Sequence, residues 1–156
     1  MIVKSENEMI NLAYKSGHQL AKSSLQNLVI YLSGDLGSGK TTFSKGLIRG
    51  LGFDGLVTSP TFSLIERIET ELFLILHIDL YRLERSEEII ELELHEEPNY
   101  SKPSIMIIEW PEKGHNLILP PNIEISFEIT KIDDERQIRL KDDTNKLGNT
   151  FNNWLE

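Results

Sequence analysis

The sequence predicts an α/β fold, a three-layer sandwich in which helices cover both faces of a central, mainly parallel sheet. Residues 28–32 and 105–108 are apolar without alternation, as is typical of strands buried on both faces. Residues 6–22 and a segment that begins at Lys40 instead repeat apolar residues at helical spacing. This succession of strands and helices is the pattern of a parallel sheet with helical connections.

The first predicted helix has a start signal. Ser5 is followed three residues later by Glu8, the spacing of a capping box in which each side chain satisfies a backbone donor at the helix start. Apolar residues then recur at helical spacing from Ile10 to Ala21. This pattern predicts an amphipathic helix over residues 6–22.

The second predicted helix begins at Lys40 and has one apolar face. Every fourth residue from Phe43 to Leu51 is apolar, which places these side chains on the same side of a helix. Gly50 and Gly52 supply the stop signal.

Four strands and a short helix are expected in the rest of the chain. Residues 61–68 and 72–80 form two strand-like runs with a tight polar link, which predicts an antiparallel hairpin inserted after the first strand–helix unit. A helix start is expected at Ser86, where the apolar spacing that follows fits both a helix and a strand. An alternating strand at 123–129 is expected to pair with residues 137–140.

Length and composition indicate one globular domain. The 156 residues are 39% hydrophobic and 26% charged, and we expect a domain over residues 1–150 with a tail at 151–156. The chain has no cysteine, which excludes a disulfide framework, a thiolate zinc site and a catalytic thiol. Its start lacks the apolar stretch of a signal peptide, and its apolar runs are far shorter than the ~20 residues of a membrane span. We therefore expect a cytoplasmic protein with no membrane segment.

The net charge of −9 is concentrated in one segment. Residues 66–100 hold 11 acidic and 3 basic side chains, whereas the rest of the chain is nearly balanced. A protein that binds nucleic acid alone usually shows a basic stretch, because phosphate neutralisation supplies most of the affinity, and this sequence has none. We interpret the acidic segment as a solvated helix face, with a docking surface for a basic partner as the alternative.

One motif carries clear chemistry. The segment from Gly34 to Thr41 fits G-x-x-x-x-G-K-[ST] without a mismatch, and it lies between a predicted buried strand and a predicted helix. Glycines at 34, 37 and 39 allow backbone angles that turn consecutive N–H groups toward phosphate oxygens. The Lys40 ammonium can contact the β- and γ-phosphates, and the Thr41 hydroxyl can bind Mg²⁺. The sequence thus predicts a nucleotide phosphate site.

Two carboxylates qualify as further ligands for Mg²⁺, because each follows an apolar strand. Glu109 comes directly after residues 105–108, in the place of a Walker-B acid. Asp79 ends the other run, with His77 two residues earlier on the same face. We interpret His77 as a hydrogen-bonded sheet residue and not as a catalytic base. The four histidines of the chain do not have the spacing of a zinc site.

Residues 130–133, Thr-Lys-Ile-Asp, match the short pattern with which GTP-binding domains read guanine. Such a short pattern recurs easily by chance, and no D-x-x-G follows either acidic strand. We interpret the match as a coincidence, so ATP is the expected nucleotide.

Taken together, four segments resemble one family, the TsaE (YjeE-type) P-loop ATPases of bacterial tRNA threonylcarbamoyladenosine biosynthesis. They are residues 34–43, 59–64 (Ser-Pro-Thr-Phe-Ser-Leu), 77–83 (His-Ile-Asp-Leu-Tyr-Arg-Leu) and 108–113 (Ile-Glu-Trp-Pro-Glu-Lys). The phosphate loop alone is generic. The other segments make the resemblance specific, and their order and spacing match across residues 27–115.

The resemblance implies a P-loop NTPase fold and a small ATPase that binds ATP and Mg²⁺ and is slow alone. It also implies docking onto a heterodimer of two actin-fold-type subunits, of the TsaB and TsaD types, that makes threonylcarbamoyladenosine at position 37 of tRNA. Hydrolysis would reset that complex between rounds, and the protein would reach tRNA only indirectly.

The resemblance also implies roles for individual residues. The phosphates and the nucleotide would be held by Gly37, Ser38, Gly39, Lys40, Thr41, Thr42 and Arg136. Thr41 and Glu109 would hold Mg²⁺. Asp79 and Thr61 would lie near the γ-phosphate, so that the expected catalytic residues are Lys40, Asp79, Glu109 and Thr61.

Two other functions use the same loop. A small-molecule kinase would need an acceptor pocket and a lid with arginines, for which Arg82 and Arg85 are the available residues. A nucleotide-gated binding module would bind ATP without hydrolysing it. Products formed from labelled ATP distinguish all three.

Overall fold

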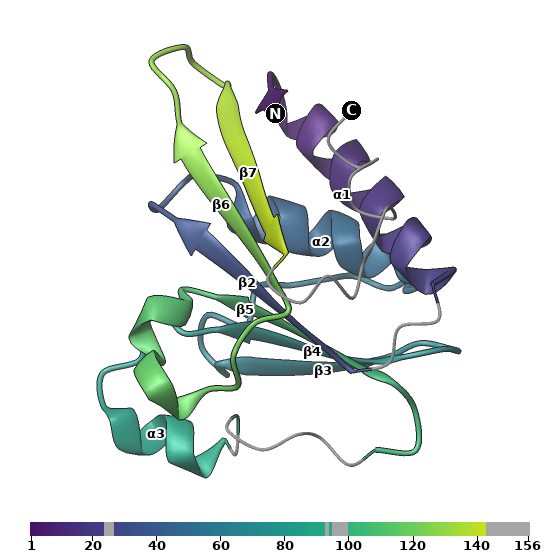
Figure 1. The fold of residues 1–156 in the computed structure, drawn as a ribbon, viewed down its shortest axis with the longest axis vertical. Helices are drawn as coiled ribbons and strands as arrows, with labels where there is room; N and C mark the ends of the chain where they lie inside the picture. Colours follow the sequence, from purple (N-terminus) through teal and green to yellow (C-terminus); the bar gives the residue numbers. More distant parts are fainter. Residues whose placement is uncertain (24–26, 93, 95–99, 143–156) are drawn as a thin grey trace.

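The computed structural model describes residues 1–23, 27–92, 94 and 100–142, and these residues form one seven-stranded sheet with helices on both faces (Figure 1). The strands are β1 (Ile2–Val3), β2 (Leu28–Gly34), β3 (Ile65–Glu69), β4 (Leu74–Asp79), β5 (Ser104–Glu109), β6 (Ile123–Ile129) and β7 (Arg136–Asp142). The helices are α1 (Glu6–Ala21), α2 (Lys40–Gly50), α3 (Ser86–Glu91) and the 3₁₀ turns η1 (Pro111–Lys113) and η2 (His115–Leu117).

The centre of the sheet is parallel and its edges are antiparallel. The spatial order is β1-β7-β6-β2-β5-β4-β3, and β6, β2, β5 and β4 run parallel to one another. The β3–β4 and β6–β7 pairs are antiparallel hairpins, and β1 adds an antiparallel edge beside β7. The predicted α/β sandwich with a mainly parallel sheet and an inserted hairpin is therefore confirmed.

Alternate residues of the central strands lie in two different apolar cores. On β2, Leu28 and Ile30 lie in the core under α1 and α2, whereas Val29 lies in the core beneath α3 and the 3₁₀ turns. On β5, Ile107 and Ile108 divide between the two cores in the same way. Burial on both faces explains why these strands are apolar without alternation.

Glycines bring α1 and α2 into close contact on one face of the sheet (Figure 1). A Cβ atom at Gly50 would lie 2.1 Å from the Tyr14 carbonyl oxygen, and one at Gly17 would lie 2.3 Å from the Leu47 carbonyl oxygen. Any larger side chain at these positions would push the helices apart. The tight crossing holds the start of α1 close to the start of α2.

The capping signal of α1 is confirmed with one difference. The Glu8 backbone N–H donates to Ser5 Oγ (3.2 Å), as the capping box predicts. The Glu8 carboxylate, however, accepts from the Lys4 N–H (2.7 Å), one residue before the expected donor.

The β3–β4 hairpin is shorter than expected. The prediction of a strand from residue 61 is wrong, because β3 begins at Ile65. Before it, the Leu64 N–H donates to the Pro60 carbonyl (2.8 Å) and Leu64 has φ of 62°, so this segment turns. At the other end, Thr70 and Phe73 close a turn through their backbone (2.9 Å), which delays β4 until Leu74.

Other sequence predictions have mixed outcomes. The ambiguous segment at Ser86 is helical, α3, and β7 pairs with β6 as expected. The two-residue strand β1 and the turns η1 and η2 carry no periodicity and were not predicted. The predicted tail at 151–156 lies outside the described residues. In the described part of the chain no helix is long and apolar enough to cross a membrane.

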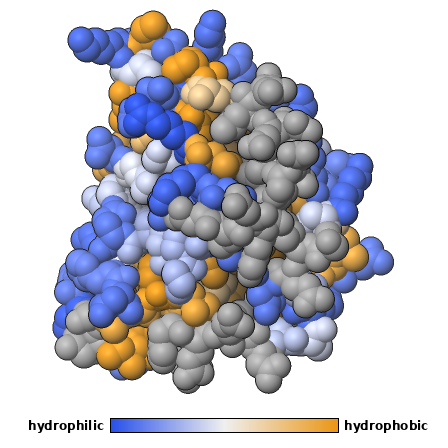
Figure 2. All heavy atoms as spheres, viewed as in Figure 1, coloured by the Kyte–Doolittle hydropathy of each residue, from blue (hydrophilic) through white to orange (hydrophobic). Residues whose placement is uncertain are grey.

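The β6–β7 hairpin extends beyond the core of the sheet. Its outer end carries hydrophobic side chains at the surface (Figure 2), and Ile132 is 63% exposed. Its return strand begins beside the start of α1 (Figure 1).

Strand order places one loop at a branch point of the sheet. β2 lies between β5 and β6, so both strands that flank it come from later, separate parts of the chain. The loop that follows β2 begins at this point of the sheet. In α/β sheets such a point leaves a crevice beyond the strand ends. The carboxyl ends of β2, β4 and β5 meet there, with α2 starting directly above.

Candidate functional site

The loop between β2 and α2 depends on three glycines with positive φ. Gly34, Gly37 and Gly39 have φ of 143°, 78° and 103°. Gly34 is also packed against β6, since a Cβ atom there would lie 2.3 Å from the Phe127 carbonyl oxygen. These angles are open to glycine and strained for other residues. The predicted phosphate loop therefore has the conformation that its glycines imply.

The Lys40 side chain is buried inside this loop. Its Nζ donates to the carbonyl oxygens of Gly34 (2.6 Å) and Asp35 (2.9 Å) and lies 3.8 Å from the centre of the Trp110 ring. Burial lowers the Lys40 pKa below its ordinary value, although the Glu109 carboxylate opposes this shift. The ammonium is thus held by two neutral carbonyl groups and an aromatic face.

Trp110 takes an unusual conformation to cover the lysine. It follows β5 directly and has φ of 59°, a left-handed angle that is strained for a bulky side chain. Its ring also contacts Tyr81, with centroids 5.0 Å apart. The sequence alone did not assign a role to Trp110. The signal that could have done so is its position immediately after Glu109.

The Glu109 carboxylate is buried and accepts three hydrogen bonds. Its Oε2 accepts from Thr41 Oγ1 (2.8 Å), and its Oε1 accepts from Ser44 Oγ (2.8 Å) and His77 Nε2 (2.9 Å). Burial alone would raise the Glu109 pKa, but the hydrogen bonds from His77, Thr41 and Ser44 outweigh it and hold the pKa below its ordinary value. This carboxylate is ionised and tightly oriented.

Ser44 was not anticipated, and His77 lies where the sequence suggested. Ser44 follows Thr41 by three residues on α2, so both hydroxyls face Glu109. His77 is fully buried on β4 and bonded to Glu109, which confirms a hydrogen-bonded sheet residue.

Asp79 ends β4 directly beside Glu109 in the sheet register. Its Oδ2 accepts from Ser59 Oγ (3.2 Å) and Thr61 Oγ1 (3.4 Å), and its Oδ1 accepts from the Tyr81 backbone N–H (3.0 Å). The Ser59 and Thr61 hydroxyls are themselves 2.7 Å apart. The two carboxylates from neighbouring strands thus face one site.

A cavity of about 300 Å³ joins these groups, and we call it the inner cavity. It is lined by Leu36, Gly37, Gly39, Lys40, Thr41, Thr42, Ser59, Thr61, Asp79, Tyr81, Glu109 and Trp110. The four predicted catalytic residues are therefore brought together in one place. Ser38 is buried in the loop wall, and its Oγ has no hydrogen-bond partner among the described residues.

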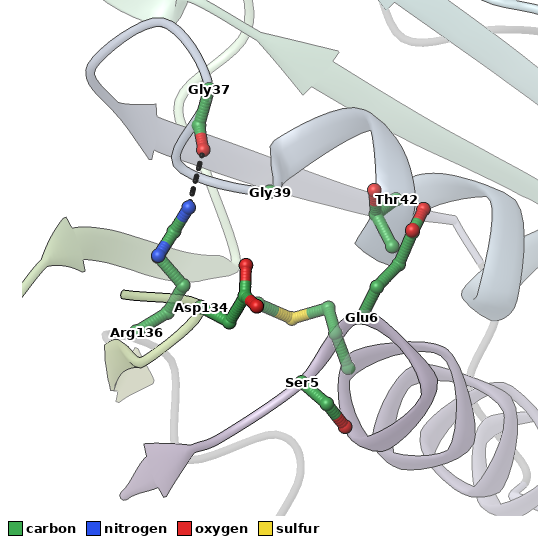
Figure 3. Close-up of a pocket in the computed structure, with 8 residues that line it drawn as sticks. Ser5, Glu6, Gly37, Gly39, Thr42, Asp134 and Arg136 are labelled. Carbon is green, nitrogen blue, oxygen red and sulfur yellow. Dashed lines mark hydrogen bonds between the residues drawn. The ribbon is translucent and has the colours of Figure 1, made fainter. Parts of the chain in front are cut away.

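A second cavity of about 210 Å³, the outer cavity, lies between the loop, the start of α1 and the β6–β7 hairpin (Figure 3). Gly37, Gly39 and Thr42 line both cavities. The start of α1 and the β6–β7 hairpin close the outer one with Ser5, Glu6, Met9, Asp134 and Arg136.

Arg136 reaches across the outer cavity to the loop. Its Nη2 donates to the Gly37 carbonyl (3.3 Å), and its Nη1 donates to the Glu135 carbonyl (2.9 Å) (Figure 3). The predicted nucleotide-side arginine therefore lies at the loop, brought there by a strand about a hundred residues further along the chain.

The groups around the inner cavity suit a magnesium ion and phosphates. The Thr41 hydroxyl and the Glu109 and Asp79 carboxylates are oxygen ligands, which Mg²⁺ prefers. The glycine-rich loop leads into the N-terminus of α2, where the backbone N–H groups of the first turn and the helix dipole favour anions.

Residues 130–133 lie in the turn of the β6–β7 hairpin. Thr130 Oγ1 accepts from the Ile132 N–H (3.2 Å), so the threonine stabilises the turn locally. These residues are not among those that line the outer cavity. The interpretation of their pattern as a coincidence stays a prediction.

A mainly parallel sheet with this loop at its branch point is the fold of a P-loop NTPase. A family model described as threonylcarbamoyl adenosine biosynthesis protein TsaE matches residues 3–138. The chain belongs to the TsaE family, which takes part in tRNA threonylcarbamoyladenosine biosynthesis.

Individual relatives agree with this assignment. The chain is 36% identical over 144 residues to the tRNA threonylcarbamoyladenosine biosynthesis protein TsaE of Haemophilus influenzae, covering 92% of this chain and 89% of the relative. It is 39% identical over 130 residues to the protein of the same name from Rickettsia felis, covering 83% and 72%. The crystal structure of Bacillus subtilis YdiB superposes with a TM-score of 0.73 over 99% of this chain and 92% of that one, at 24% identity, which supports the fold.

Proposed function

We propose that the protein is a Mg²⁺-dependent ATPase subunit that docks on, and resets, a complex making threonylcarbamoyladenosine at position 37 of tRNA. The observation that carries the proposal is the convergence of Lys40, Thr41 and Glu109 on one cavity at the glycine-rich loop. Phosphoryl transfer needs positioning and charge neutralisation more than covalent chemistry, and these residues supply both.

Lys40 would bind the β- and γ-phosphates together with the backbone N–H groups of the loop. Its Nζ now contacts two neutral carbonyl oxygens, and phosphate oxygens are stronger acceptors for an ammonium. Phosphate binding would also restore the Lys40 pKa that burial depresses, because a nearby anion favours the charged form.

Thr41 and Glu109 would hold Mg²⁺, which when bound neutralises charge on the phosphates. The Thr41 hydroxyl can keep its hydrogen bond to Glu109 Oε2 while its lone pairs face the cation. Asp79, with Thr61 beside it, would lie at the γ-phosphate end of the inner cavity.

The outer cavity would take the base and ribose, because it adjoins the inner cavity and shares Gly37, Gly39 and Thr42 with it. Arg136 would contact the nucleotide there. ATP is favoured over GTP because the guanine-like segment at 130–133 is used in a turn.

Slow turnover without a partner follows from the hydrogen bonds of the two carboxylates. Glu109 already accepts three side-chain donors, and Asp79 accepts two hydroxyls and a backbone N–H. Neither carboxylate is poised to take a proton from water. A heterodimer of TsaB- and TsaD-type subunits would complete the site and would be the only contact with tRNA. The cytoplasmic location stays a prediction with this proposal.

The proposal is tested first by calorimetry with Mg²⁺ and ATP or GTP, and then by phosphate release. We expect binding of ATP in preference to GTP, slow release alone and faster release with the two partner subunits. The absence of ATP binding contradicts the proposal. A phosphorylated acceptor formed from labelled ATP and nucleosides would instead identify a kinase, and binding without phosphate release, even with partners, a binding module.

Glu109→Ala tests the cation site in the same assays. We expect Mg²⁺-dependent hydrolysis to be lost while nucleotide binding partly survives, because Lys40 and the loop remain. Unchanged turnover in this variant would contradict the assignment of Glu109.

A further inference from the structure

His77 is a polar side chain at a position that suits an apolar one. It lies in the interior of β4, is fully buried, and neighbours Ile107 on β5. Burying a polar ring costs free energy unless all of its polar atoms are paired. A role beyond packing is therefore required to explain a histidine here.

One ring nitrogen of His77 is paired and the other is not. Nε2 lies 2.9 Å from Glu109 Oε1, while Nδ1 is buried and has no hydrogen-bond partner in the part of the chain that the structure describes. Because Nε2 faces a carboxylate oxygen, Nε2 carries the proton and donates it. Nδ1 is then a buried polar atom without a partner among the described residues, a cost that the Glu109 hydrogen bond must offset.

Of the two donors to Glu109 Oε1, His77 is the one with no competing acceptor among the described residues. Ser44 Oγ has one proton to share between Glu109 Oε1 (2.8 Å) and the Lys40 carbonyl (3.1 Å). Thr41 contacts the other oxygen, Oε2, from the loop side. Glu109 Oε1 thus faces His77 on β4, while Oε2 faces Thr41 at the loop.

We propose that His77 is a positioning residue that holds Glu109 Oε1 inward so that Oε2 faces Thr41 and the divalent cation. This inference rests on the proposed role of Glu109 as a ligand of Mg²⁺. Groups that orient a metal ligand commonly change metal affinity by 10- to 100-fold when they are removed. His77 acts through Glu109 and has no contact of its own with phosphate.

The test measures binding of Mn²⁺, as a probe for Mg²⁺, to the full chain with ADP by electron paramagnetic resonance. In His77→Leu we expect a loss of Mn²⁺ affinity of roughly tenfold or more, with ADP affinity in chelator unchanged. In His77→Gln the side-chain amide can still donate to Glu109, so we expect most of the affinity to return. Ile78→Val, on the same strand and away from Glu109, controls for core loosening.

The outcomes separate this inference from the proposed function. Wild-type Mn²⁺ affinity in His77→Leu, or equal losses of Mn²⁺ affinity in His77→Leu and Ile78→Val, would overturn the positioning role. If His77→Leu does not fold, as judged by thermal melting, a His77→Gln variant with Mn²⁺ affinity reduced tenfold overturns it equally. Retained Mn²⁺ affinity in Glu109→Ala overturns the cation site itself, and with it the proposed function.

Discussion

The inner and outer cavities share one loop but are built in different ways. Around the inner cavity, Lys40, Asp79 and Glu109 are buried and each makes two or more hydrogen bonds. Around the outer cavity, one exposed hydrogen bond from Arg136 to Gly37 joins the hairpin to the loop. The inner cavity is anchored by the sheet, whereas the outer one is closed by surface segments.

This difference predicts which of the two cavities should tolerate mutation without loss of nucleotide binding. Removing one partner of a buried, hydrogen-bonded charged group costs several kcal/mol, because the other partner is left unpaired. Removing an exposed contact costs much less free energy. We therefore expect phosphate and cation binding to fail sharply on mutation and base recognition to change gradually.

The largest effect is expected for Lys40→Ala. Removal of the buried ammonium should weaken ATP binding by about a thousandfold, about 4 kcal/mol, because no other cation lines the inner cavity among the described residues. Lys45→Ala, on the same helix and outside both cavities, is the matched control. Calorimetry checks both variants. Similar losses in the two would break the contrast between buried and surface charges.

The next effect concerns the anchoring of the loop to the sheet. Gly34→Ala should lower the free energy of unfolding by about 3 kcal/mol, since the new Cβ meets the Phe127 carbonyl at 2.3 Å in addition to a strained φ. Gly37→Ala has open space around its Cβ and should lose about 1 kcal/mol from backbone strain alone. Urea unfolding measures both. Equal losses would show that the anchor to β6 does not stabilise the loop.

A smaller effect is expected in the outer cavity. Arg136→Ala should weaken ATP binding by about tenfold and leave the affinity for inorganic tripolyphosphate unchanged, because we expect that ligand to occupy the inner cavity, which Arg136 does not line. Arg139→Ala, on the same strand and paired with Glu128 at the surface, serves as control. If tripolyphosphate binding falls as much as ATP binding, the two cavities are not separable.

The smallest effect is on the pH dependence of stability without metal. The Glu109 pKa is lowered in the folded protein, so on acidification the unfolded chain takes up its proton first. The stability that ionised Glu109 contributes is therefore complete above its unfolded pKa and is lost as the pH falls through its folded pKa. Thermal melting in chelator from neutral pH to about pH 3 should show wild type losing its advantage over Glu109→Gln. If the stability advantage of wild type over Glu109→Gln instead grew on acidification, the pKa of Glu109 would be raised in the folded protein.

Local sequence patterns were sufficient for the phosphate loop and the two acids of the inner cavity. The motif from Gly34 to Thr41 and the acids at the ends of two apolar strands identified Lys40, Asp79 and Glu109, because parallel strands end at one edge of a sheet. Periodicity likewise predicted α1, α2 and the central strands. Periodicity placed the start of the first hairpin strand too early, at residue 61, because the positive φ of Leu64 leaves no periodic signal.

Contacts that depend on folding could not be predicted in this way. Trp110 covers Lys40 only because its backbone adopts a left-handed angle, and Ser44 reaches Glu109 only because α2 lies over β5. The outer cavity needs three segments from distant parts of the chain to meet. The residue spacing within one of these segments does not indicate that the other two lie beside it.

The sequence by itself determined the fold class, the phosphate loop and the two strand-end acids, because each follows from the conformational preferences and burial of consecutive residues. Only the tertiary structure decided how the Glu109 carboxylate is turned, what covers the lysine and where a base would sit. Those features arise from packing between elements, and their energies depend on which donors and acceptors meet once water has been excluded.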